Sequence, residues 1–527
     1  MKHGFLRRVT ALLLCGMLVL PLASCEQETE TRLPESASVT ENRETVLPDS
    51  ETEAGTETLS GRAPYDYDYD GSPIGTGVGV FPGRVTWAYR PGTFQWEDSG
   101  YWWMGHNFDA DAVKTMLSDA ICQLAGKDNV NDALDALIRN QNLRRTGKDT
   151  GYQAGEKIFI KTNMNVTKNG AATNNNATGY FPSPFTMKAL LELLVSCGVA
   201  PGDITIGDPS RTFPSYVTMM CTSGELKGVN ILSYNENQAK GAQADTSKPV
   251  TWSHDRTSDG WQEYNGECAV FPTYWPEKVT EASYLINLFN LRGHSLAGFT
   301  AAAKNHFGTI MPGRTEKDGS VSFPQEFRIN PPTWSGVHHY VSALDGFSLE
   351  PKELWDLPKR DMGTYTVLVD LMSNADCGGK TFLYLCDALA ATLHQEQRLT
   401  TEEKFISAPF GNGTNGSGSW TNSFLASQDP VAIDSVCLDF LLAEQRAANA
   451  VGDRKWNDYL QEGGTAENYL IEAALADNPP SGTLYCDGYG NPVPSLGAHE
   501  HWNNDYDRQY SRNLGKDEGI ELVKITY

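Results

Sequence analysis

The chain of 527 residues is 40% hydrophobic and 20% charged and contains 12 Trp, 22 Tyr and 20 Phe, a composition that excludes disorder throughout. Its 66 acidic residues against 42 Lys and Arg leave a net charge of −24. Because nucleic acids bind to cationic surfaces and the chain has no Lys/Arg-rich block, we expect no nucleic-acid partner.

The first 24 residues have the layout of a secretory signal peptide. Lys2, Arg7 and Arg8 precede an apolar run over residues 9–22, which is too short to span a membrane. The run ends in Leu-Ala-Ser-Cys at residues 22–25, which resembles a bacterial lipobox. This resemblance implies cleavage before Cys25 and acylation of its thiol. We therefore expect an exported protein that is lipid-anchored to the cell membrane or the outer membrane.

Residues 25–63 are predicted to form a disordered acidic tether. Ten acidic residues stand there among Thr, Ser and Pro, opposed by only three Arg. Such a segment buries too little apolar surface to offset the entropy lost on ordering. We divide the rest into an N-terminal helical and loop extension (64–150), an α/β core (151–447) and a C-terminal extension packed on the core (448–527).

The folded part shows helical spacing of apolar residues alternating with short apolar runs. The predicted elements are, in chain order, a helix at 109–126, a strand at 157–161, a helix at 183–198, strands at 203–208, 284–288 and 381–386, and a helix that begins at 429. Because the strands are apolar on both faces, we expect an α/β fold with a mostly parallel, doubly covered, Rossmann-like sheet and long loop-rich insertions.

Polar residues stand where these strands end, which is where such sheets bind ligands. They are Lys161, Asn163, Asn165, Asp208, His294, Lys304, Asn305, Asp387 and Asp429. We assign catalysis to His294, Lys304, Lys161 and Asp208, since His transfers protons near neutral pH and a desolvated Lys acts as a base or nucleophile. The Asn residues, Asp387 and Asp429 are the candidates for binding a cofactor. Structural alternatives stay open, among them a helix cap at Asp429 and a turn at Asp208.

His499 and His501 alternate along an extended segment, which directs both imidazoles to one side. They are a candidate metal pair whose third ligand is not assigned, and a structural role is the alternative. No C-x-x-C pair is present, so we expect no iron–sulfur cluster. The glycine run at 75–79 lacks a strand–turn–helix context, so we expect no NAD. The cofactor stays open, with a divalent metal as a candidate.

Four stretches resemble the bacterial and archaeal domain-of-unknown-function family numbered 362. They are residues 155–163, 204–208, 294–308 and 425–434, and they occur in the family's order. The resemblance covers residues from about 150 to 445 and implies that 151–447 form the family's α/β core. The flanks at 79–85 and 499–504 look like those of an exported lipoprotein branch. Many relatives carry a ferredoxin-like cysteine cluster that this chain lacks, so electron transfer is not implied.

Residues 294–300, followed by Lys304, are also similar to a stretch in nickel-pincer lactate racemases. In that family an acid/base histidine precedes the lysine that carries the cofactor. The resemblance therefore implies that His294 shuttles a proton and that Lys304 contacts a cofactor. For the nickel-binding histidine there are only candidates, namely His306, His338 and His339.

Two functions follow from these features. The first is an enzyme that acts on an anionic or polyhydroxylated small molecule by proton transfer, like a racemase or epimerase. It requires His294, Lys304, Asp208 and Lys161 to meet in one cleft. The second is a lipid-anchored protein that binds a glycan or solute without catalysis. It would use loop aromatic residues as stacking surfaces, namely Trp87, Trp96, Trp102, Trp103, Trp252, Trp261, Trp275 and Trp334.

Overall fold

The structure, a computed structural model, describes most of the chain after residue 68. The described residues are 69–164, 179–234, 242–253, 273–294, 297–315, 318–323, 362–393, 399–452 and 465–527, together with the backbone of 263–264 and 267–268. All of them belong to the second of two compact units, residues 62–527. Cys25, Asn165, His338 and His339 lie outside the described residues, as do Trp261 and Trp334.

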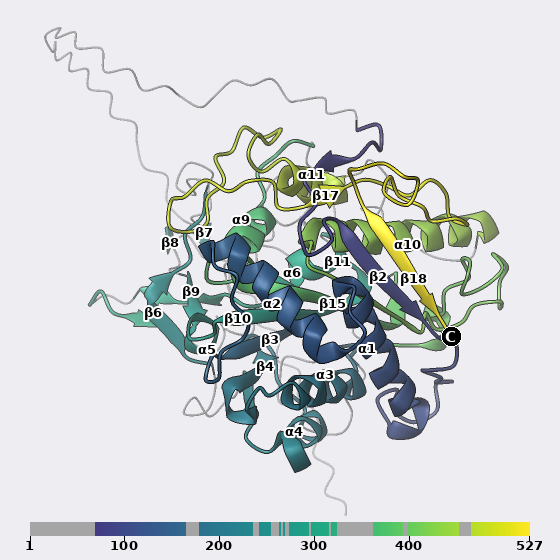
Figure 1. Cartoon of the computed structure of the whole chain (residues 1–527), viewed down its shortest axis with the longest axis horizontal. Helices are drawn as coiled ribbons and strands as arrows, with labels where there is room; N and C mark the ends of the chain where they lie inside the picture. Colours follow the sequence, from purple (N-terminus) through teal and green to yellow (C-terminus); the bar gives the residue numbers. More distant parts are fainter. Residues whose placement is uncertain are drawn as a thin grey trace, which may run out of the picture. The chain divides into compact units, whose positions relative to one another are not determined.

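A nine-stranded sheet runs through the described part of the chain (Figure 1). Its strands, in spatial order, are β18 (Glu521–Thr526), β2 (Arg84–Tyr89), β16 (Ser423–Ser427), β15 (Thr381–Thr392), β10 (Tyr284–His294), β3 (Ile158–Thr162), β4 (Ile204–Asp208) and β5 (Asn230–Ser233), with β11 (Gly298–Thr300) paired to the end of β10. Only β16 and the short β11 run antiparallel to their neighbours. The predicted α/β fold with a mostly parallel sheet is therefore confirmed.

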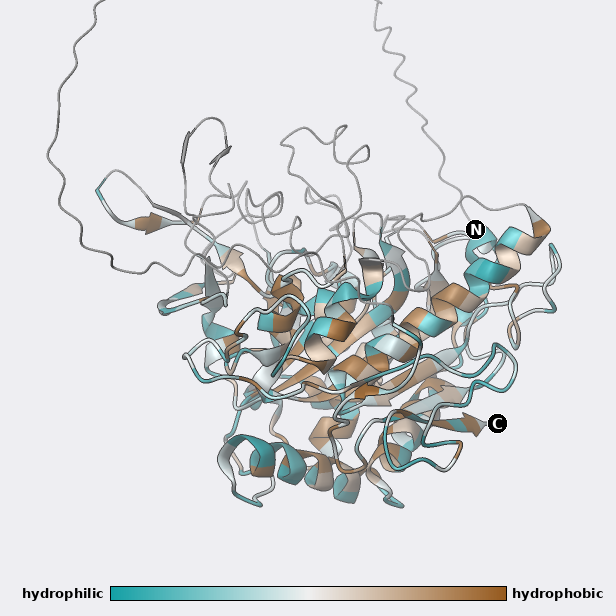
Figure 2. Ribbon diagram, turned by 90° about the horizontal axis from the view of Figure 1, so that it is seen from above, coloured by the Kyte–Doolittle hydropathy of each residue, from teal (hydrophilic) through white to brown (hydrophobic). Residues whose placement is uncertain are grey.

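Helices cover both faces of this sheet, as predicted. One apolar layer joins α1 (Ala110–Ala125), α2 (Val130–Thr146), α3 (Pro184–Ser196) and α4 (Ser215–Thr222) to one side of the strands. The other joins α5 (Glu277–Thr280), α6 (Ala302–Phe307), α9 (Val367–Ser373), α10 (Pro430–Val451) and α11 (Asn468–Ala474) to the opposite side. Figure 2 shows apolar residues gathered in the strands and on the inner sides of the helices.

Several shorter strands lie outside the main sheet. β1 (Ile74–Gly75) pairs with β17 (Ala498–His499), and β6 (Ala244–Pro249), β9 (Thr273–Pro276) and β12 (Met311–Pro312) form a three-stranded sheet. Two further pairs are β13 (Arg314–Thr315) with β14 (Val321–Ser322) and β7 (Glu263–Tyr264) with β8 (Glu267–Cys268). No helix among the described residues is both long enough and apolar enough to cross a bilayer.

The predicted helices begin and end where their capping residues stand. The Asp109 carboxylate accepts a hydrogen bond from the Ala112 N–H, and α1 ends at Gly126, whose φ of 62° suits glycine. Ser183 caps α3 in the same way, with Pro184 in the first turn. These local signals explain why the sequence located both helices.

The sheet contains strands that were not predicted, namely β2, β5, β11, β16 and β18, and two predicted strands are longer than expected. β2 from the N-terminal extension and β18 from the C-terminal extension lie side by side as parallel strands (Figure 1). The predicted strands at 284–288 and 381–386 are also too short, because β10 continues to His294 and β15 to Thr392. Burial explains the extensions: every residue of both strands is buried, polar ones included.

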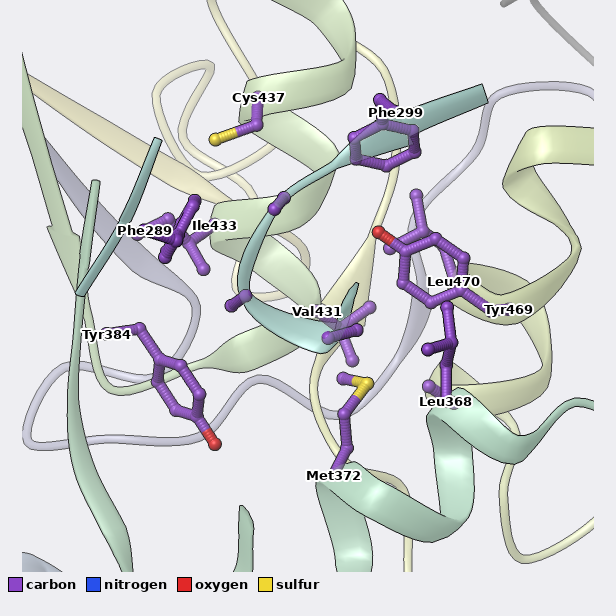
Figure 3. Close-up of a cluster of buried hydrophobic side chains, with 14 of the residues drawn as sticks. Phe289, Phe299, Leu368, Met372, Tyr384, Val431, Ile433, Cys437, Tyr469 and Leu470 are labelled. Atoms are coloured by element: carbon purple, nitrogen blue, oxygen red, sulfur yellow. The ribbon is translucent and has the colours of Figure 1, made fainter. Parts of the chain in front are cut away.

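Helix α10 crosses the core of one layer. Its residues Val431, Ile433 and Cys437 lie in one apolar cluster with Phe299 of β11 and Tyr469 of α11 (Figure 3). The Phe299 and Tyr469 rings are in contact, with centroids 5.7 Å apart. This packing holds the hairpin after β10 against the C-terminal part of the chain.

Candidate functional site

Lys161 is buried at the carboxyl end of β3. Its Nζ donates hydrogen bonds to the Thr162 carbonyl (2.6 Å), to Asn305 Oδ1 (3.1 Å) and to Asp208 Oδ2 (3.2 Å). The structure thus brings three predicted site residues together, from β3, β4 and α6. An ammonium has three N–H donors, and all three are used here. Lys161 and Asp208 therefore hold the ends of β3 and β4 together, and their assignment to catalysis stays a prediction.

Both the oxygen and the nitrogen of the Asn305 side-chain amide form hydrogen bonds. Its Oδ1 accepts from Lys161, and its Nδ2 donates to Asn287 Oδ1 (2.7 Å) and to the carbonyls of Leu288 and Lys161. Asn287 in turn donates to the Ala302 carbonyl in the first turn of α6. Asn305 therefore joins α6 to the sheet, and cofactor binding, which was predicted for it, finds no support here. Asn163 follows β3 and is partly buried.

Four buried polar side chains share one face at the same end of the sheet. Asn290 and Arg292 are alternate residues of β10, so their side chains lie on one face of the sheet. Thr162 of β3 lies beside Leu288, which belongs to the same alternating set, and Thr300 of β11 lies beside Arg292 across the hairpin. All four are at most 5% exposed. Among the described residues, no hydrogen-bond partner is found for Arg292 Nε and Nη1, Asn290 Oδ1, Thr162 Oγ1 or Thr300 Oγ1. Since buried polar atoms are normally paired, this face suits a polar ligand.

Four cations meet near this face. Lys304 of α6 is partly buried, and burial together with the positive charges of Arg211, Arg292 and Lys161 holds its pKa well below the usual value. Burial and the nearby Arg211 also lower the pKa of Arg292 to about 10. Among the described residues, Asp208 contacts this group, and it is paired with Lys161. The local charge is therefore positive, although the chain as a whole is strongly acidic.

His294 ends β10, two residues after Arg292 on the same face. Its Nδ1 accepts a hydrogen bond from the Ala297 N–H at 3.0 Å, within the turn that leads to β11. Because Nδ1 accepts, a neutral His294 ring carries its proton on Nε2. The side chain is 6% exposed.

The carboxylates of the two remaining predicted residues, Asp387 and Asp429, accept hydrogen bonds from backbone N–H groups. Asp387 accepts from the N–H groups of Ser183 (2.6 Å) and Leu389 (3.1 Å), so it anchors the start of α3. Asp429 accepts from the N–H groups of Val431, Ala432, Val78 and Ala498, which fill both of its oxygens. The capping alternative thus describes Asp429, and the contacts do not support cofactor binding by either carboxylate.

Asp434 of α10 was not singled out from the sequence, although it supports the site. Its two oxygens accept from the N–H groups of Ala302 and Ala303, and Tyr469 donates to it at 3.0 Å. It thereby fixes the start of the helix that carries Lys304. The only signal was its place in the stretch that ends at residue 434, since an aspartate at an apolar helix position is unusual.

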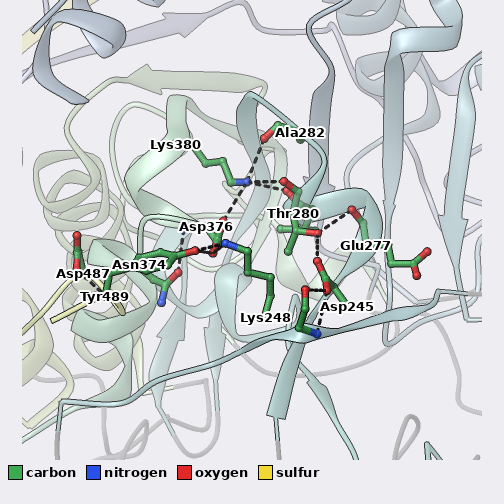
Figure 4. Close-up of polar contacts among 12 residues, drawn as sticks. Asp245, Lys248, Glu277, Thr280, Ala282, Asn374, Asp376, Lys380, Asp487 and Tyr489 are labelled. Carbon is green, nitrogen blue, oxygen red and sulfur yellow. Dashed lines mark hydrogen bonds and ion pairs between the residues drawn. The ribbon is translucent and has the colours of Figure 1, made fainter. Parts of the chain in front are cut away.

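The end of the sheet where β15 begins shows how this fold provides hydrogen-bond acceptors for a buried lysine. Lys380, just before β15, donates to the carbonyls of Val279 (2.9 Å) and Ala282 (3.0 Å), and its Nζ lies 3.6 Å from an oxygen of Asp376 (Figure 4). Burial lowers its pKa to about 8. Arg292 is equally buried but has no such set of acceptors for Nε and Nη1 among the described residues.

His499 and His501 come together with a third residue, Glu467. Within the described residues, these three offer ligand atoms that all lie within 4.8 Å of one another. His501 Nε2 is 2.6 Å from Glu467 Oε1, and its Nδ1 is 2.5 Å from Asp439 Oδ1. Burial lowers the pKa of His501, but the two carboxylates outweigh burial and raise it to about 11. The sequence could not identify Glu467, which lies 32 positions before His499.

A family model described as a domain of unknown function (DUF362) matches residues 158–439, more than half of the chain. The chain belongs to this family. No curated protein matches the chain.

The DUF362 match contains the cationic group at the strand ends, including Lys161, Arg211, Arg292 and Lys304. It ends at Asp439, so Glu467, His499 and His501 lie beyond it. The resemblance to nickel-pincer racemases finds no further support. His306 is fully buried, with Nδ1 3.3 Å from Cys377 Sγ and its ring against Tyr384. We therefore derive no step through a nickel cofactor.

Most of the tryptophans that were candidate stacking surfaces are part of the core. Those buried are Trp87, Trp96, Trp102, Trp252 and Trp275. Trp103 is partly buried and stacked between Tyr101 and Tyr216. Within the described residues, these rings do not form an exposed aromatic groove.

Proposed function

We propose that this protein is an enzyme that binds an anionic small molecule at the carboxyl ends of β3, β4 and β10 and transfers a proton at a carbon of that molecule. The buried guanidinium of Arg292 carries this proposal. A buried cation without acceptors is costly unless an anion pairs with it. A carboxylate or phosphate oxygen would accept a charge-assisted hydrogen bond from Nε or Nη1.

The neighbouring atoms favour an anion that also carries a hydroxyl group. Asn290 Nδ2 donates to the Asp387 carbonyl at 3.2 Å, which leaves Oδ1 as an acceptor on the face of Arg292. Thr162 and Thr300 add hydroxyl groups that both donate and accept. A 2-hydroxy acid or a sugar acid presents a carboxylate and a hydroxyl on adjacent carbons, and matches this combination.

Lys304 is the proposed base. Burial and neighbouring cations lower the pKa of Lys304 and so favour its neutral amine, which takes up a proton. It removes the proton from the carbon next to the substrate carboxylate, and the electron pair moves onto the carboxylate oxygen. His294, with its proton on Nε2, donates a hydrogen bond to that oxygen. Return of the proton to either side of the carbon gives exchange or inversion.

The test is proton exchange in deuterated water with a panel of 2-hydroxy acids and sugar acids. We expect the wild-type chain to exchange the hydrogen next to the carboxylate of at least one acid, and Lys304→Met to abolish exchange without loss of binding. Lys188→Met is the matched control, because Lys188 lies exposed on α3. Binding without exchange by the wild type would support the alternative, a solute-binding protein. If the wild-type chain neither binds nor exchanges any of these acids, the proposal is refuted.

We also propose that the protein is exported and lipid-anchored through Cys25. The signal-like residues 1–24, the lipobox-like residues 22–25 and the acidic segment that follows support this proposal. Labelling of cells with a radioactive or clickable fatty acid should modify the wild-type chain and leave Cys25→Ala unlabelled. Equal labelling of both would refute acylation at Cys25.

A further inference from the structure

The group formed by Glu467, His499 and His501 has the donors of a zinc site. Two imidazoles and one carboxylate are a known set of three protein ligands for Zn²⁺, with a fourth position left for water. A tetrahedral ion with bonds of about 2.0–2.1 Å keeps its ligand atoms about 3.3 Å apart. The ligand atoms here lie within 4.8 Å of one another, so small side-chain movements would bring them to these separations.

His499 provides the observation that points to a ligand. The residue is fully buried, and among the described residues its Nε2 has no hydrogen-bond partner. Its Nδ1 is 2.8 Å from Ser435 Oγ, which fixes the ring. The Nε2 atom of His499 lies in the group with His501 and Glu467.

The surroundings supply the second layer of contacts that metal-binding histidines use. Asp439 holds His501 Nδ1, and also accepts from the Trp502 N–H (3.0 Å) and from the Tyr510 hydroxyl (2.7 Å). A carboxylate or hydroxyl on the far nitrogen sets the tautomer and direction of a ligating imidazole. Both histidines have such a contact, and both contacts come from α10. The His501 side chain is 12% exposed, which provides a route for an ion.

We propose that Glu467, His499 and His501 bind one divalent ion of the zinc class. The ion joins the start of α11 to β17, two segments that pack on α10. It thereby fixes the C-terminal part of the chain, which lies beyond the DUF362 match. Carboxylate and imidazole donors without thiolate suit Zn²⁺, and Co²⁺ can replace it as a spectroscopic probe. This site is independent of the proposed proton transfer at β10.

The experiment measures zinc binding by the full chain, purified without a metal-affinity step and stripped with a chelator. Titration with ZnCl2 should show one tight site in the wild type and raise its melting temperature with zinc concentration. His499→Gln and Glu467→Gln should lose this site but melt like the zinc-free wild type. His106→Gln is the matched control, because His106 is exposed on the 3-10 helix Gly105–Asn107.

Two further measurements keep the proposal testable if a ligand variant does not fold. Ser435→Ala removes the support of His499 without removing a ligand, and should weaken zinc binding about 10-fold. Co²⁺ bound to the wild type should give the intense visible absorption of a four- or five-coordinate ion. The proposal is overturned if the wild type binds no zinc, if both ligand variants bind it as tightly as the wild type, or if Co²⁺ shows the weak spectrum of six-coordinate surface binding.

Discussion

Arg292 and Lys380 are two buried cations for which the same kind of substitution should have opposite effects on stability. Arg292→Met retains most of the side-chain volume and removes two buried nitrogens, Nε and Nη1, for which no acceptor is found among the described residues. Each such group costs about 1–3 kcal/mol. Part of this gain is offset by changed packing, so we expect the free energy of unfolding to rise by about 2 kcal/mol.

Lys380→Met removes a cation whose partners are in place. It leaves the carbonyls of Val279 and Ala282 and the carboxylate of Asp376 without their donor. Removing one member of a buried pair typically costs about 3–5 kcal/mol, so this variant should be less stable than the wild type.

The assay is denaturant unfolding in a buffer without phosphate, sulfate or carboxylates, followed by addition of phosphate. In that buffer Arg292→Met should have a higher denaturation midpoint than the wild type, and Lys380→Met a lower one. Added phosphate should raise the midpoint of the wild type and of Lys380→Met, but not that of Arg292→Met. If Arg292→Met were less stable than the wild type without anions, the guanidinium would have partners in the protein, and the anion site would lose its basis.

Three further predictions concern charge and capping. The rate of proton exchange should fall as the pH is lowered, with a midpoint well below pH 10.5, because Lys304 acts as a neutral amine and its pKa is lowered. A rate that rises only above pH 10 would contradict this role. Burial lowers the pKa of His306 to about 3, so its contribution to stability is complete above pH 6.5 and is lost as the pH falls. Between pH 6.5 and 4.5, the free energy of unfolding of His306→Gln, measured by urea unfolding, should therefore fall by about 2 kcal/mol less than that of the wild type. Asp429→Ala should cost about 3 kcal/mol or more, because four buried N–H groups lose their acceptor, whereas Asp109→Ala at the exposed start of α1 should cost about 1 kcal/mol.

Elements with local signals were predictable from the sequence. The capping residues Asp109, Ser183 and Asp429 each stand directly before an apolar helical pattern, and all three precede helices in the structure. The strands β2 and β18 were missed because their burial depends on pairing between the two ends of the chain. No local pattern reports a contact between residues more than 400 positions apart.

The position of the candidate site could be predicted from the sequence, but the roles of its individual residues could not. The rule that ligands bind at the carboxyl ends of parallel strands led to Lys161, Asp208 and Lys304. Whether a lysine offers its charge to a ligand depends on how many acceptors surround it, and Lys161 has three while Arg292 lacks them at two nitrogens. The predicted strand ended at residue 288, so the sequence did not place Arg292 on a face of the sheet. In the structure β10 continues to His294, which places Arg292 on the same face as Asn290.

Helix α10 supports both the cationic group at the strand ends and the group formed by Glu467, His499 and His501. Asp434 holds the start of α6, which carries Lys304, whereas the next residue, Ser435, holds His499. Successive side chains leave a helix about 100° apart, so the two contacts lie on different sides of α10. Asp439, about one turn further on, holds His501. A shift or rotation of α10 would therefore displace the lysine of one group and both imidazoles of the other, which explains why this helix is anchored at its start by the four hydrogen bonds to Asp429.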